Sequence, residues 1–483
     1  MKIAIAYPPM ESPKGVPLLS QNRQFQWFNR PTYIYPVVPA YAATMAKHAG
    51  HSVFWLDGIS AGETSGAFLD ELEGVAPDLV LLETKTPVVA RTWDWIATIK
   101  KRMPNVIAVL CGDHVTALPQ ESMEKSQADY ILTGGDYDFL LVNLAAHIEN
   151  RAVALEPGIW YRDARGAAQS TGEFRLDHDL NTLPLIDREL TCWKRYSVHN
   201  GNYRRTPGAY IMAGRDCWHG RCSFCSWTTL YPKYRTRSPE TVVDEIGYLI
   251  DNYGVREIMD DTGCFPVGEW LRTFCRLMIE RGYNKKIYFD CNMRFGALGA
   301  EDYALMKKAG FRFVLFGLES ANQATLDLLN KRLKVAQIRE GARLASEAGL
   351  DVHVTVMLGY PWENSAEIDR TVALARDLLR RGWAYTLQVT FLIPYPGTPL
   401  FRDCEEKKLL LTTNWEDYDM RMQIMRTEVP ADEIRCAIRR IYRGFFHPLA
   451  LLNRLAHTRH PVEDAKFYVR GLLSLFGHLK DFK

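Results

Sequence analysis

Short apolar runs that alternate with helical patterns constrain the fold of this chain more than any other feature. Five runs in residues 1–150 are almost continuously apolar and stop at Gly, Pro or polar residues: Lys2–Ala6, Ser52–Leu56, Asp78–Leu82, Val106–Leu110 and Tyr130–Leu132. Such runs are typical of strands buried on both faces. Helical patterns lie between them, over Val38–Ala49, Ala67–Leu72 and Ala90–Lys101. The alternation predicts an α/β domain with an open, doubly wound, Rossmann-like parallel sheet.

The alternation resumes with longer helices in residues 206–400. Six strand candidates are Ala209–Ala213, Glu257–Met259, Ile287–Cys291, Arg312–Phe316, Val352–Leu358 and Leu387–Leu392. Periodicity alone allows a second open sheet or part of a barrel, and in a barrel the chemistry lies at the carboxyl ends of the strands. We expect a first domain at 1–150, a connector with a small β element at 151–205, the second α/β domain at 206–400 and a helical region at 401–483.

Composition excludes several classes of protein. The chain has 483 residues, of which 47% are hydrophobic and 24% charged, with a formal net charge of +2. This is the composition of a globular protein and offers no global field for nucleic acid, which we do not expect as a partner. The sequence contains neither an apolar run of the ~20 residues that span a bilayer nor a recognisable signal peptide. We therefore expect a cytoplasmic location.

The C-terminal stretch Ile434–Val462 is basic and contains no acidic residue. Its arginines are Arg435, Arg439, Arg440, Arg443, Arg454 and Arg459. One interpretation is a helical cap packed on the preceding domain. The other is an amphipathic surface for peripheral membrane contact or a lipid-like substrate.

Three of the ten cysteines are clustered, at Cys217, Cys222 and Cys225, directly after the first strand candidate of the second unit. Three thiolates within nine residues can hold zinc or an iron–sulfur cluster. Structural zinc normally takes four ligands, and only His219 lies inside the loop. A cluster with three protein ligands leaves one iron open to an external ligand, so we favour a cluster over zinc or a chance grouping. The other seven cysteines are interpreted as small buried hydrophobes.

The loop DCWHGRCSFC resembles the signature of the radical S-adenosylmethionine (SAM) enzymes, although its spacing is four residues then two rather than the commoner three then two. In that family three cysteines hold a [4Fe–4S] cluster, SAM chelates the fourth iron, and one-electron reduction yields a 5′-deoxyadenosyl radical. Further segments resemble the family in the same order: Glu257–Phe265, Phe316–Ser320, Met357–Glu363 and Pro394–Leu400. The resemblance implies a partial (β/α)6 TIM-type barrel over residues 206–400.

The resemblance also implies roles for single residues. Cys217, Cys222 and Cys225 would bind the cluster. The residues implied for SAM are Phe224 beside the adenine, Asp260 and Asp261 at the ammonium, Arg294 at the carboxylate, and Glu319 and Ser320 at the ribose or methionyl part. The alternatives are a solvated loop carboxylate for Asp261 or Glu319 and a surface salt bridge for Arg294. No catalytic side chain is assigned.

The first domain is similar to the cobalamin-binding domain of one radical SAM subfamily. The resemblance rests on Tyr35–Gly50, Cys111–Pro119, Asp129–Asp136 and the Leu183-Pro184 connector. Cobalamin would lie at the strand ends, and the candidate residues there are Tyr7, Thr84, Thr86, Gly112, His114, Gly134 and Gly135. The chain has no Asp-x-His-x-x-Gly motif, so cobalamin binds without a histidine ligand or the domain is a vestigial scaffold. A nucleotide is less expected, because neither G-x-G-x-x-G nor a P-loop is present.

The resemblance implies a cobalamin-dependent radical SAM enzyme that methylates an unactivated carbon of a hydrophobic or natural-product substrate, with a flavodoxin or ferredoxin as electron donor. One alternative is a cyclase or rearrangement enzyme of lipid or tetrapyrrole biosynthesis. Another is a methylthiotransferase, but this would usually call for a second three-cysteine set, and Cys111 is the only cysteine before the connector. The non-enzymatic alternative is an iron–sulfur or zinc binding module.

Overall fold

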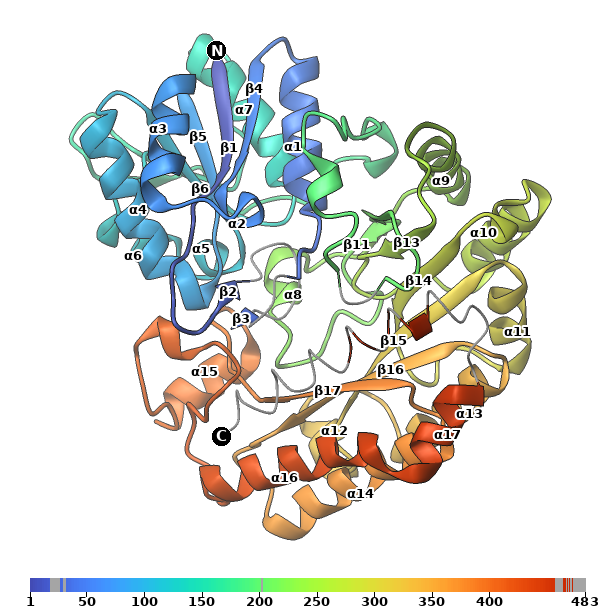
Figure 1. Cartoon of the computed structure of the whole chain (residues 1–483). Helices are drawn as coiled ribbons and strands as arrows, with labels where there is room; N and C mark the ends of the chain where they lie inside the picture. The colour runs from blue at the N-terminus through green and yellow to red at the C-terminus, as the bar shows by residue number, and fades with distance from the viewer. Residues whose placement is uncertain are drawn as a thin grey trace.

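The computed structural model (Figure 1) describes residues 1–17, 27–28, 32–200 and 203–456, together with residues 464, 465, 467, 469 and 471. An N-terminal α/β unit, blue to cyan in the figure, leads into a second α/β unit drawn in green to orange. Helical segments drawn in orange to red follow the last strand.

The N-terminal sheet has seven strands in the order β4-β1-β5-β6-β7-β8-β9. Their bounds are β1 Lys2–Tyr7, β4 Ser52–Asp57, β5 Leu79–Glu83, β6 Ile107–Cys111, β7 Tyr130–Leu132, β8 Ile159–Arg162 and β9 Ala168–Ser170. The first five are parallel, as predicted, and follow the doubly wound order 2-1-3-4-5, which switches direction between β1 and β5. The β8–β9 hairpin pairs antiparallel with β7. The predicted small β element of the connector therefore extends this sheet and makes it mixed.

Both faces of this sheet are covered, which explains why its strands read as unbroken apolar runs. Ile3 and Ile5 of β1 belong to the core that includes helices α1 (Val37–His48) and α7 (Tyr137–Glu149). Ala4 and Ala6 belong to a separate core with the helices of the other face. Those helices are α3 Ser65–Val75, α4 Val89–Arg102 and α6 Pro119–Lys125, while the short α2 (Gly58–Ala61) and α5 (Asp113–Ala117) follow β4 and β6.

The second sheet has six parallel strands in the order β10-β13-β14-β15-β16-β17, which confirms the predicted partial barrel. Its strands are β10 Gly208–Ile211, β13 Glu257–Asp260, β14 Tyr288–Met293, β15 Phe311–Glu319, β16 Asp351–Leu358 and β17 Thr386–Phe391. The helices are α9 Pro239–Tyr253, α10 Glu269–Glu280, α11 Ala300–Lys308, α12 Gln323–Leu328, α13 Val335–Glu347 and α14 Ser365–Arg381. In Figure 1, α9, α10, α11, α13 and α14 lie along the outer side of the strands.

Local signals fix the ends of the barrel helices. Helix α9 starts at an N-cap serine, Ser238, whose hydroxyl accepts from the backbone of Thr241, and it ends at Gly254 in the left-handed conformation. Helix α14 starts with a capping box between Asn364 and Glu367 and ends at Gly382. Such caps fix the residues at which each helix begins and ends, and therefore where the chain turns toward the next strand.

Two short strands interrupt the first βα unit of the barrel. β11 (Gly214–Arg215) and β12 (Arg235–Thr236) form an antiparallel ladder. The ladder closes the base of segment 216–234, which carries all three clustered cysteines and the short helix α8 (Trp227–Leu230). We call segment 216–234 the cysteine loop.

The segment after β17 packs back on both units. It contains α15 (Pro399–Glu406), α16 (Ala431–Arg443) and α17 (Pro448–Ala456). Helix α16 buries Ile434, Ile438 and Ile441 and contacts α14 and β17, so this helix caps the barrel, as the first interpretation of the basic stretch predicted. Residues 457–462 of that stretch, with Arg459, lie outside the described residues. Within the described residues, no helix combines the length and apolarity that a membrane span needs.

Candidate active site

The three clustered cysteines lie on the cysteine loop at the carboxyl end of β10. All three side chains are partly exposed. Backbone hydrogen bonds hold the loop at Ser223, which donates to the carbonyl of Leu329 (3.0 Å) and accepts from the amide of Leu400 (2.9 Å). The loop is thus attached to the end of the barrel helix α12 and to the start of α15, which follows the last barrel strand.

The described residues contain no assembled site for a single metal ion at this loop. In the part of the chain that the structure describes, no three His, Cys, Asp or Glu side chains converge as the ligands of one ion would. Zinc needs that convergence. A [4Fe–4S] cluster takes one thiolate on each of three irons, so its cysteines lie farther apart. The donor set fits a cluster better than zinc.

Two cations lie near Cys222. Burial raises the pKa of this thiol to about 11, while the nearby charges of Lys331 and Arg294 act in the opposite direction. A metal ligand must be a thiolate, and metal binding releases its proton. Lys331 and Arg294 would therefore offset the negative charge that Cys222 acquires when it binds iron.

The acidic pair predicted at the SAM ammonium follows β13. Asp260 is fully buried and accepts hydrogen bonds from the backbone of Ala213 (2.6 Å) and Thr262 (3.0 Å). Burial raises the pKa of Asp260 to about 7, against the effect of these hydrogen bonds. Its neighbour Asp261 is also buried, and its amide donates to the carbonyl of Ile211 (2.9 Å). Asp260 thus ties the end of β13 to the chain that enters the cysteine loop.

Arg294, predicted to pair with the SAM carboxylate, follows β14. Its guanidinium donates to the backbone carbonyls of Lys331 and Arg332, the second at 3.0 Å. It also lies 5.8 Å from the ring centroid of Trp218 in the cysteine loop. The structure therefore places Arg294 beside the loop, with donors already engaged by the backbone after α12.

Glu319 ends β15 and forms a buried ion pair that the sequence did not predict. Its φ is +62°, and its carboxylate accepts from the Lys331 ammonium at 2.5 Å. A Cβ on Gly317 would lie 2.0 Å from Oε1 of Glu319, so glycine makes room for the pair. Lys331 lies beyond the segment Phe316–Ser320 that carries the resemblance, and only the fold brings it to Glu319 and Cys222.

Ser320 belongs to a buried hydrogen-bond group around Glu363. The Glu363 carboxylate accepts from the hydroxyl of Ser320 (2.6 Å), the amide of Asn322 (2.9 Å) and the hydroxyl of Thr325 (2.7 Å). This group fixes the turn after β15 against the turn after β16. Ser320 thus supports the turn that presents Glu319.

Several buried polar groups near the cysteines have no hydrogen-bond partner among the described residues. They are the hydroxyls of Tyr234 and Tyr360 and the indole nitrogen of Trp218. Tyr360 is fully buried, and its pKa is raised by burial and by the charges of Glu319, Glu363 and Cys222. Buried polar groups in native proteins are normally paired, so these groups fit a bound ligand. Phe224, predicted beside the adenine, is half-buried against the apolar cluster that contains Tyr360.

The strand order of the N-terminal sheet reverses between β1 and β5, and doubly wound sheets bind ligands at such a switch point. Tyr7, at the end of β1, donates to Glu83 Oε2 (2.7 Å), and Tyr137 donates to Glu83 Oε1 (3.2 Å). Burial raises the pKa of Glu83, although Lys85 and the two hydroxyls favour its charge. The sequence analysis named Tyr7 but missed Glu83 and Lys85, which are both buried.

The other candidates at this edge are buried and bonded to one another. Thr84 donates its amide to Cys111, and a Cβ on Gly112 would lie 2.1 Å from the Thr84 carbonyl oxygen. His114 is fully buried, with one ring nitrogen 3.2 Å from Thr86 Oγ1 and the other 3.2 Å from Glu121. Both nitrogens of His114 therefore already have protein partners.

Gly134 and Gly135 are in close contact with side chains of later segments. A Cβ on Gly134 would lie 2.4 Å from the ring of Phe174, and one on Gly135 would lie 1.8 Å from the ring of Tyr231. These contacts account for both glycines through protein packing. Their contact with cobalamin stays a prediction.

The two units meet at this edge. Helix α5, which follows β6, contacts α8, which follows Cys225. A Cβ on Gly397 would touch both Thr229 of α8 and Ala117 of α5. The carboxyl edge of the N-terminal sheet thus faces the cysteine loop.

Comparisons with known proteins agree with this geometry. The profile of the Radical SAM superfamily matches residues 211–375. The chain is 25% identical over 447 residues to a protein named uncharacterized methyltransferase PH0819 from Pyrococcus horikoshii, covering 91% of this chain and 94% of that one. It is 26% identical over 459 residues to the anaerobic magnesium-protoporphyrin IX monomethyl ester cyclase of Cereibacter sphaeroides, covering 92% of this chain and 71% of the cyclase.

Among solved structures, the fold resembles the radical SAM methyltransferase TsrM from Kitasatospora setae with cobalamin and a [4Fe–4S] cluster bound. The TM-score is 0.69 at 17% identity, covering 99% of both chains, so the likeness establishes the fold alone. The matched residues 211–375 run from the end of β10 into α14 and include the cysteine loop. The profile match and the three-cysteine loop together identify residues 211–375 as a radical SAM domain.

Proposed function

We propose that this chain is a cobalamin-dependent radical SAM enzyme that methylates an unactivated carbon of a hydrophobic small molecule. The observation that carries the proposal is the position of Cys217, Cys222 and Cys225 on a loop that faces the carboxyl edge of the N-terminal doubly wound sheet. When bound, the cluster supplies the electron that cleaves SAM, and cobalamin supplies methyl transfer. The chain's own residues bind, orient and enclose the reactants.

The three cysteines would hold the cluster, and the pair of Glu319 and Lys331 would receive the amino-acid end of SAM. That end carries one carboxylate and one ammonium, which match Lys331 and Glu319 in charge. We assign the SAM carboxylate to Lys331 because Arg294 already donates to two backbone carbonyls. The unpaired hydroxyl of Tyr360 provides a further donor beside this pair.

Reductive cleavage of SAM tests the enzyme class. After anaerobic reconstitution with iron and sulfide, the protein should contain about four irons per chain and form 5′-deoxyadenosine from SAM with a chemical reductant. Cys222→Ala should abolish this cleavage. Cys436→Ala, at an exposed cysteine on α16, is the matched control and should behave as wild type. A zinc-containing, iron-free product, or an intact reduced cluster that never cleaves SAM, would overturn the proposal.

Cobalamin binding is tested separately by anaerobic titration with hydroxocobalamin, followed by gel filtration and absorbance. Retention of about one cobalamin per chain is expected, because the sheet has the ligand-binding topology and its edge faces the cysteine loop. Lack of binding would mean that the domain acts as a scaffold.

The match to the cyclase favours one second candidate, an oxidative ring closure on a large hydrophobic substrate. Mass spectrometry of reaction products distinguishes the two. Methyl transfer adds about 14 mass units to the substrate, whereas cyclisation removes hydrogen.

A further inference from the structure

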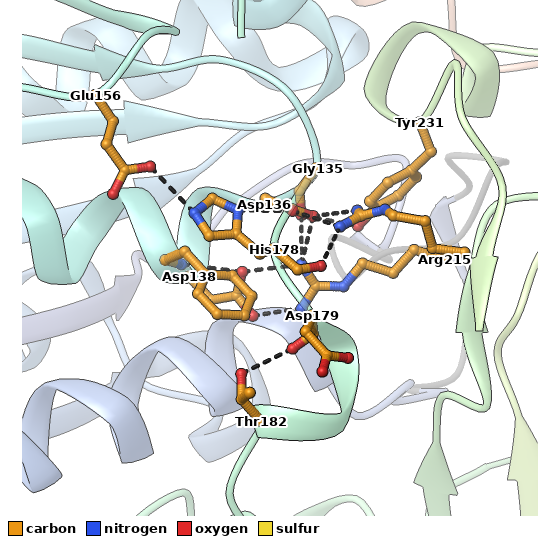
Figure 2. Close-up of polar contacts among 11 residues, drawn as sticks. Gly135, Asp136, Asp138, Glu156, His178, Asp179, Thr182, Arg215 and Tyr231 are labelled. Atoms are coloured by element: carbon orange, nitrogen blue, oxygen red, sulfur yellow. Dashed lines mark hydrogen bonds and ion pairs between the residues drawn. The ribbon is translucent and has the colours of Figure 1, made fainter. Parts of the chain in front are cut away.

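A buried group of charged side chains joins the two α/β units (Figure 2). We call it the interdomain charge cluster and define it as Asp136, Asp138, His178, Arg215 and Arg235. Arg215 donates to Asp136 (2.7 Å), to the backbone carbonyl of Gly135 (3.3 Å) and to both carboxylate oxygens of Asp138, one of them at 3.0 Å. Arg235 donates to both oxygens of Asp136, at 2.6 and 2.8 Å. Figure 2 shows the guanidinium of Arg215 directed at the two aspartates.

Three of the five charged side chains in this cluster are almost completely withdrawn from water. Arg215 and Asp136 are each 1% exposed, and Asp138 is fully buried. Although burial disfavours its charge, Arg215, His178 and Arg235 hold the pKa of Asp136 below its ordinary value. Burial raises the pKa of Asp138, and Arg215 opposes that shift. Because each charge depends on a partner from another segment, the two units cannot separate without exposing unpaired ions.

His178 is the third basic side chain of the cluster and contacts two carboxylates. One of its ring nitrogens lies 3.0 Å from Asp136 and the other 3.1 Å from Glu156, and the ring stacks on Phe139 with centroids 4.1 Å apart. The hydrogen bond with Asp136 raises the pKa of His178. When His178 is protonated, three cations face the carboxylates of Asp136, Asp138 and Glu156.

The cluster is attached directly to the cysteine loop. Arg215 and Arg235 are paired opposite each other on the β11–β12 ladder, so both ends of the loop carry an arginine that reaches Asp136. Only Asp216 separates Arg215 from Cys217, and Asp216 has a φ of +75°. The path of the chain from Arg215 to the first cysteine is therefore tightly set.

Further contacts hold the loop from the same side. The amide of Gly135 donates to the Leu230 carbonyl (3.0 Å), and the hydroxyl of Tyr231 donates to the Gly135 carbonyl (3.1 Å). The turn at residues 134–136 thus contacts the loop base at several points.

We propose that Arg215 is a positioning residue that fixes the cysteine loop to the Gly134–Asp136 turn of the N-terminal domain. By holding the loop there, Arg215 sets the place of the iron–sulfur cluster relative to the switch point between β1 and β5 of the first sheet. The inference rests on the proposed function, because it assumes that the loop holds a cluster. Arg215 touches neither cluster nor substrate in this assignment. It acts through the backbone of the loop.

A second buried arginine provides a matched control. Arg312, at the start of β15, pairs with Glu257 (2.8 Å), Asp290 (2.8 Å) and Asp351 (3.2 Å). It is as buried as Arg215 and also faces several carboxylates, but it lies at the amino end of the barrel strands, away from the cysteine loop. Arg312→Met should lower stability without moving the loop.

The experiment compares wild type with Arg215→Met, Arg215→Lys and Arg312→Met after anaerobic reconstitution. Three quantities are measured: iron per chain, the change in the electron paramagnetic resonance (EPR) spectrum of the reduced cluster when SAM is added, and 5′-deoxyadenosine formed per loaded cluster. Hydrogen exchange of residues 134–139 and 227–236 reports the docking of the loop independently of any cofactor. Arg215→Met/Asp138→Asn replaces the single variant if the unpaired aspartate prevents folding.

For Arg215→Met we expect faster exchange in both segments, loss of the SAM-dependent EPR change, and cleavage per cluster lowered by about 10²-fold, the size of effect that ~1 Å of misplacement produces. Arg215→Lys should recover part of this rate, and Arg312→Met should retain all of it per loaded cluster. Wild-type exchange and wild-type cleavage per cluster in Arg215→Met, or in the double variant, would overturn the inference. If wild type itself binds no cluster, the proposed function fails, and the exchange measurement still tests the docking.

Discussion

Gly135 offers a steric test of the contact between the two units. A Cβ at this position would lie 1.8 Å from Cε1 of Tyr231, 2.2 Å from Cζ and 2.3 Å from Cδ1. Tyr231 is only 2% exposed, so the ring has no free space into which it can turn. To restore an ordinary contact of about 3.5 Å in Gly135→Ala, the ring of Tyr231 must retreat by roughly 1.7 Å.

The cost of this movement follows from the contacts involved. Overpacking a filled site costs about 1–3 kcal/mol. Retreat of the ring also weakens the bond from the Tyr231 hydroxyl to the Gly135 carbonyl, worth about 1 kcal/mol. We therefore expect Gly135→Ala to destabilise the protein by about 2–4 kcal/mol.

Gly74→Ala is the matched control. Gly74 lies within α3, and a Cβ there would meet no atom within 4 Å. Alanine is favoured over glycine inside helices, so this variant should be more stable than wild type by about 0.5–1 kcal/mol. The two substitutions add the same atom, and their changes in the free energy of unfolding should have opposite signs.

Chemical denaturation followed by tryptophan fluorescence measures both variants, and hydrogen exchange localises the effect. Because the protein has more than one unit, the exchange of residues 227–236 is the more direct readout. If Gly135→Ala is as stable as wild type, with unchanged exchange at Tyr231, the close contact that we describe between the Gly134–Asp136 turn and the cysteine loop is wrong.

Three further outcomes are expected. Lys331→Met should weaken SAM binding by at least ~10-fold in calorimetric titrations, because it removes a charge-assisted contact worth roughly 1.5–3 kcal/mol, and unchanged affinity would exclude our assignment of the carboxylate. Since Lys331→Met also leaves Glu319 unpaired, Lys331→Met/Glu319→Gln should regain stability but not SAM affinity. Asp136 raises the pKa of His178 in the folded state. The stability that this histidine contributes should therefore be complete below its ordinary pKa of about 6.5 and be lost as pH rises through the raised value. Urea unfolding between pH 6 and 9 should show this decline in stability, and His178→Gln should remove the decline. Asn364→Ala removes the N-cap of α14 and should lower stability by about 1 kcal/mol in the same assay, without changing SAM affinity.

The sequence predicted the strands and their order of appearance well because their signal is local. The predicted strand at Leu387–Leu392 and the observed β17 at Thr386–Phe391 differ by one residue at each end. The predicted helix at Ala90–Lys101 is α4 (Val89–Arg102) shortened by one residue at each end. Burial on both faces produces the apolar runs directly, and end caps such as Ser238 mark the helices. The β8–β9 hairpin was visible too, but its pairing with β7 depends on a long-range contact.

Pairings between distant charged residues could not be predicted in the same way. Arg215 and Asp136 are 79 positions apart, and nothing in the residues around either one indicates the other. Likewise, Lys331 follows an ordinary helix, and only the left-handed turn at Glu319 brings the two side chains together. Motif resemblance located the cysteines because their spacing is itself local, whereas the groups that hold the loop come from several separate segments.

The ladder between Gly214–Arg215 and Arg235–Thr236 also bears on how this chain tolerates its unusual cysteine spacing. Because the two ends of the loop meet at paired residues, like the stem of a hairpin, its contour length is uncoupled from the register of the barrel. An inserted residue between Cys217 and Cys222 can be absorbed within the loop without shifting a single strand. The loop can in this sense be exchanged as a unit. Replacing it, between Arg215 and Arg235, with the loop of a relative whose cysteines are separated by three and then two residues should leave the strands on either side undisturbed.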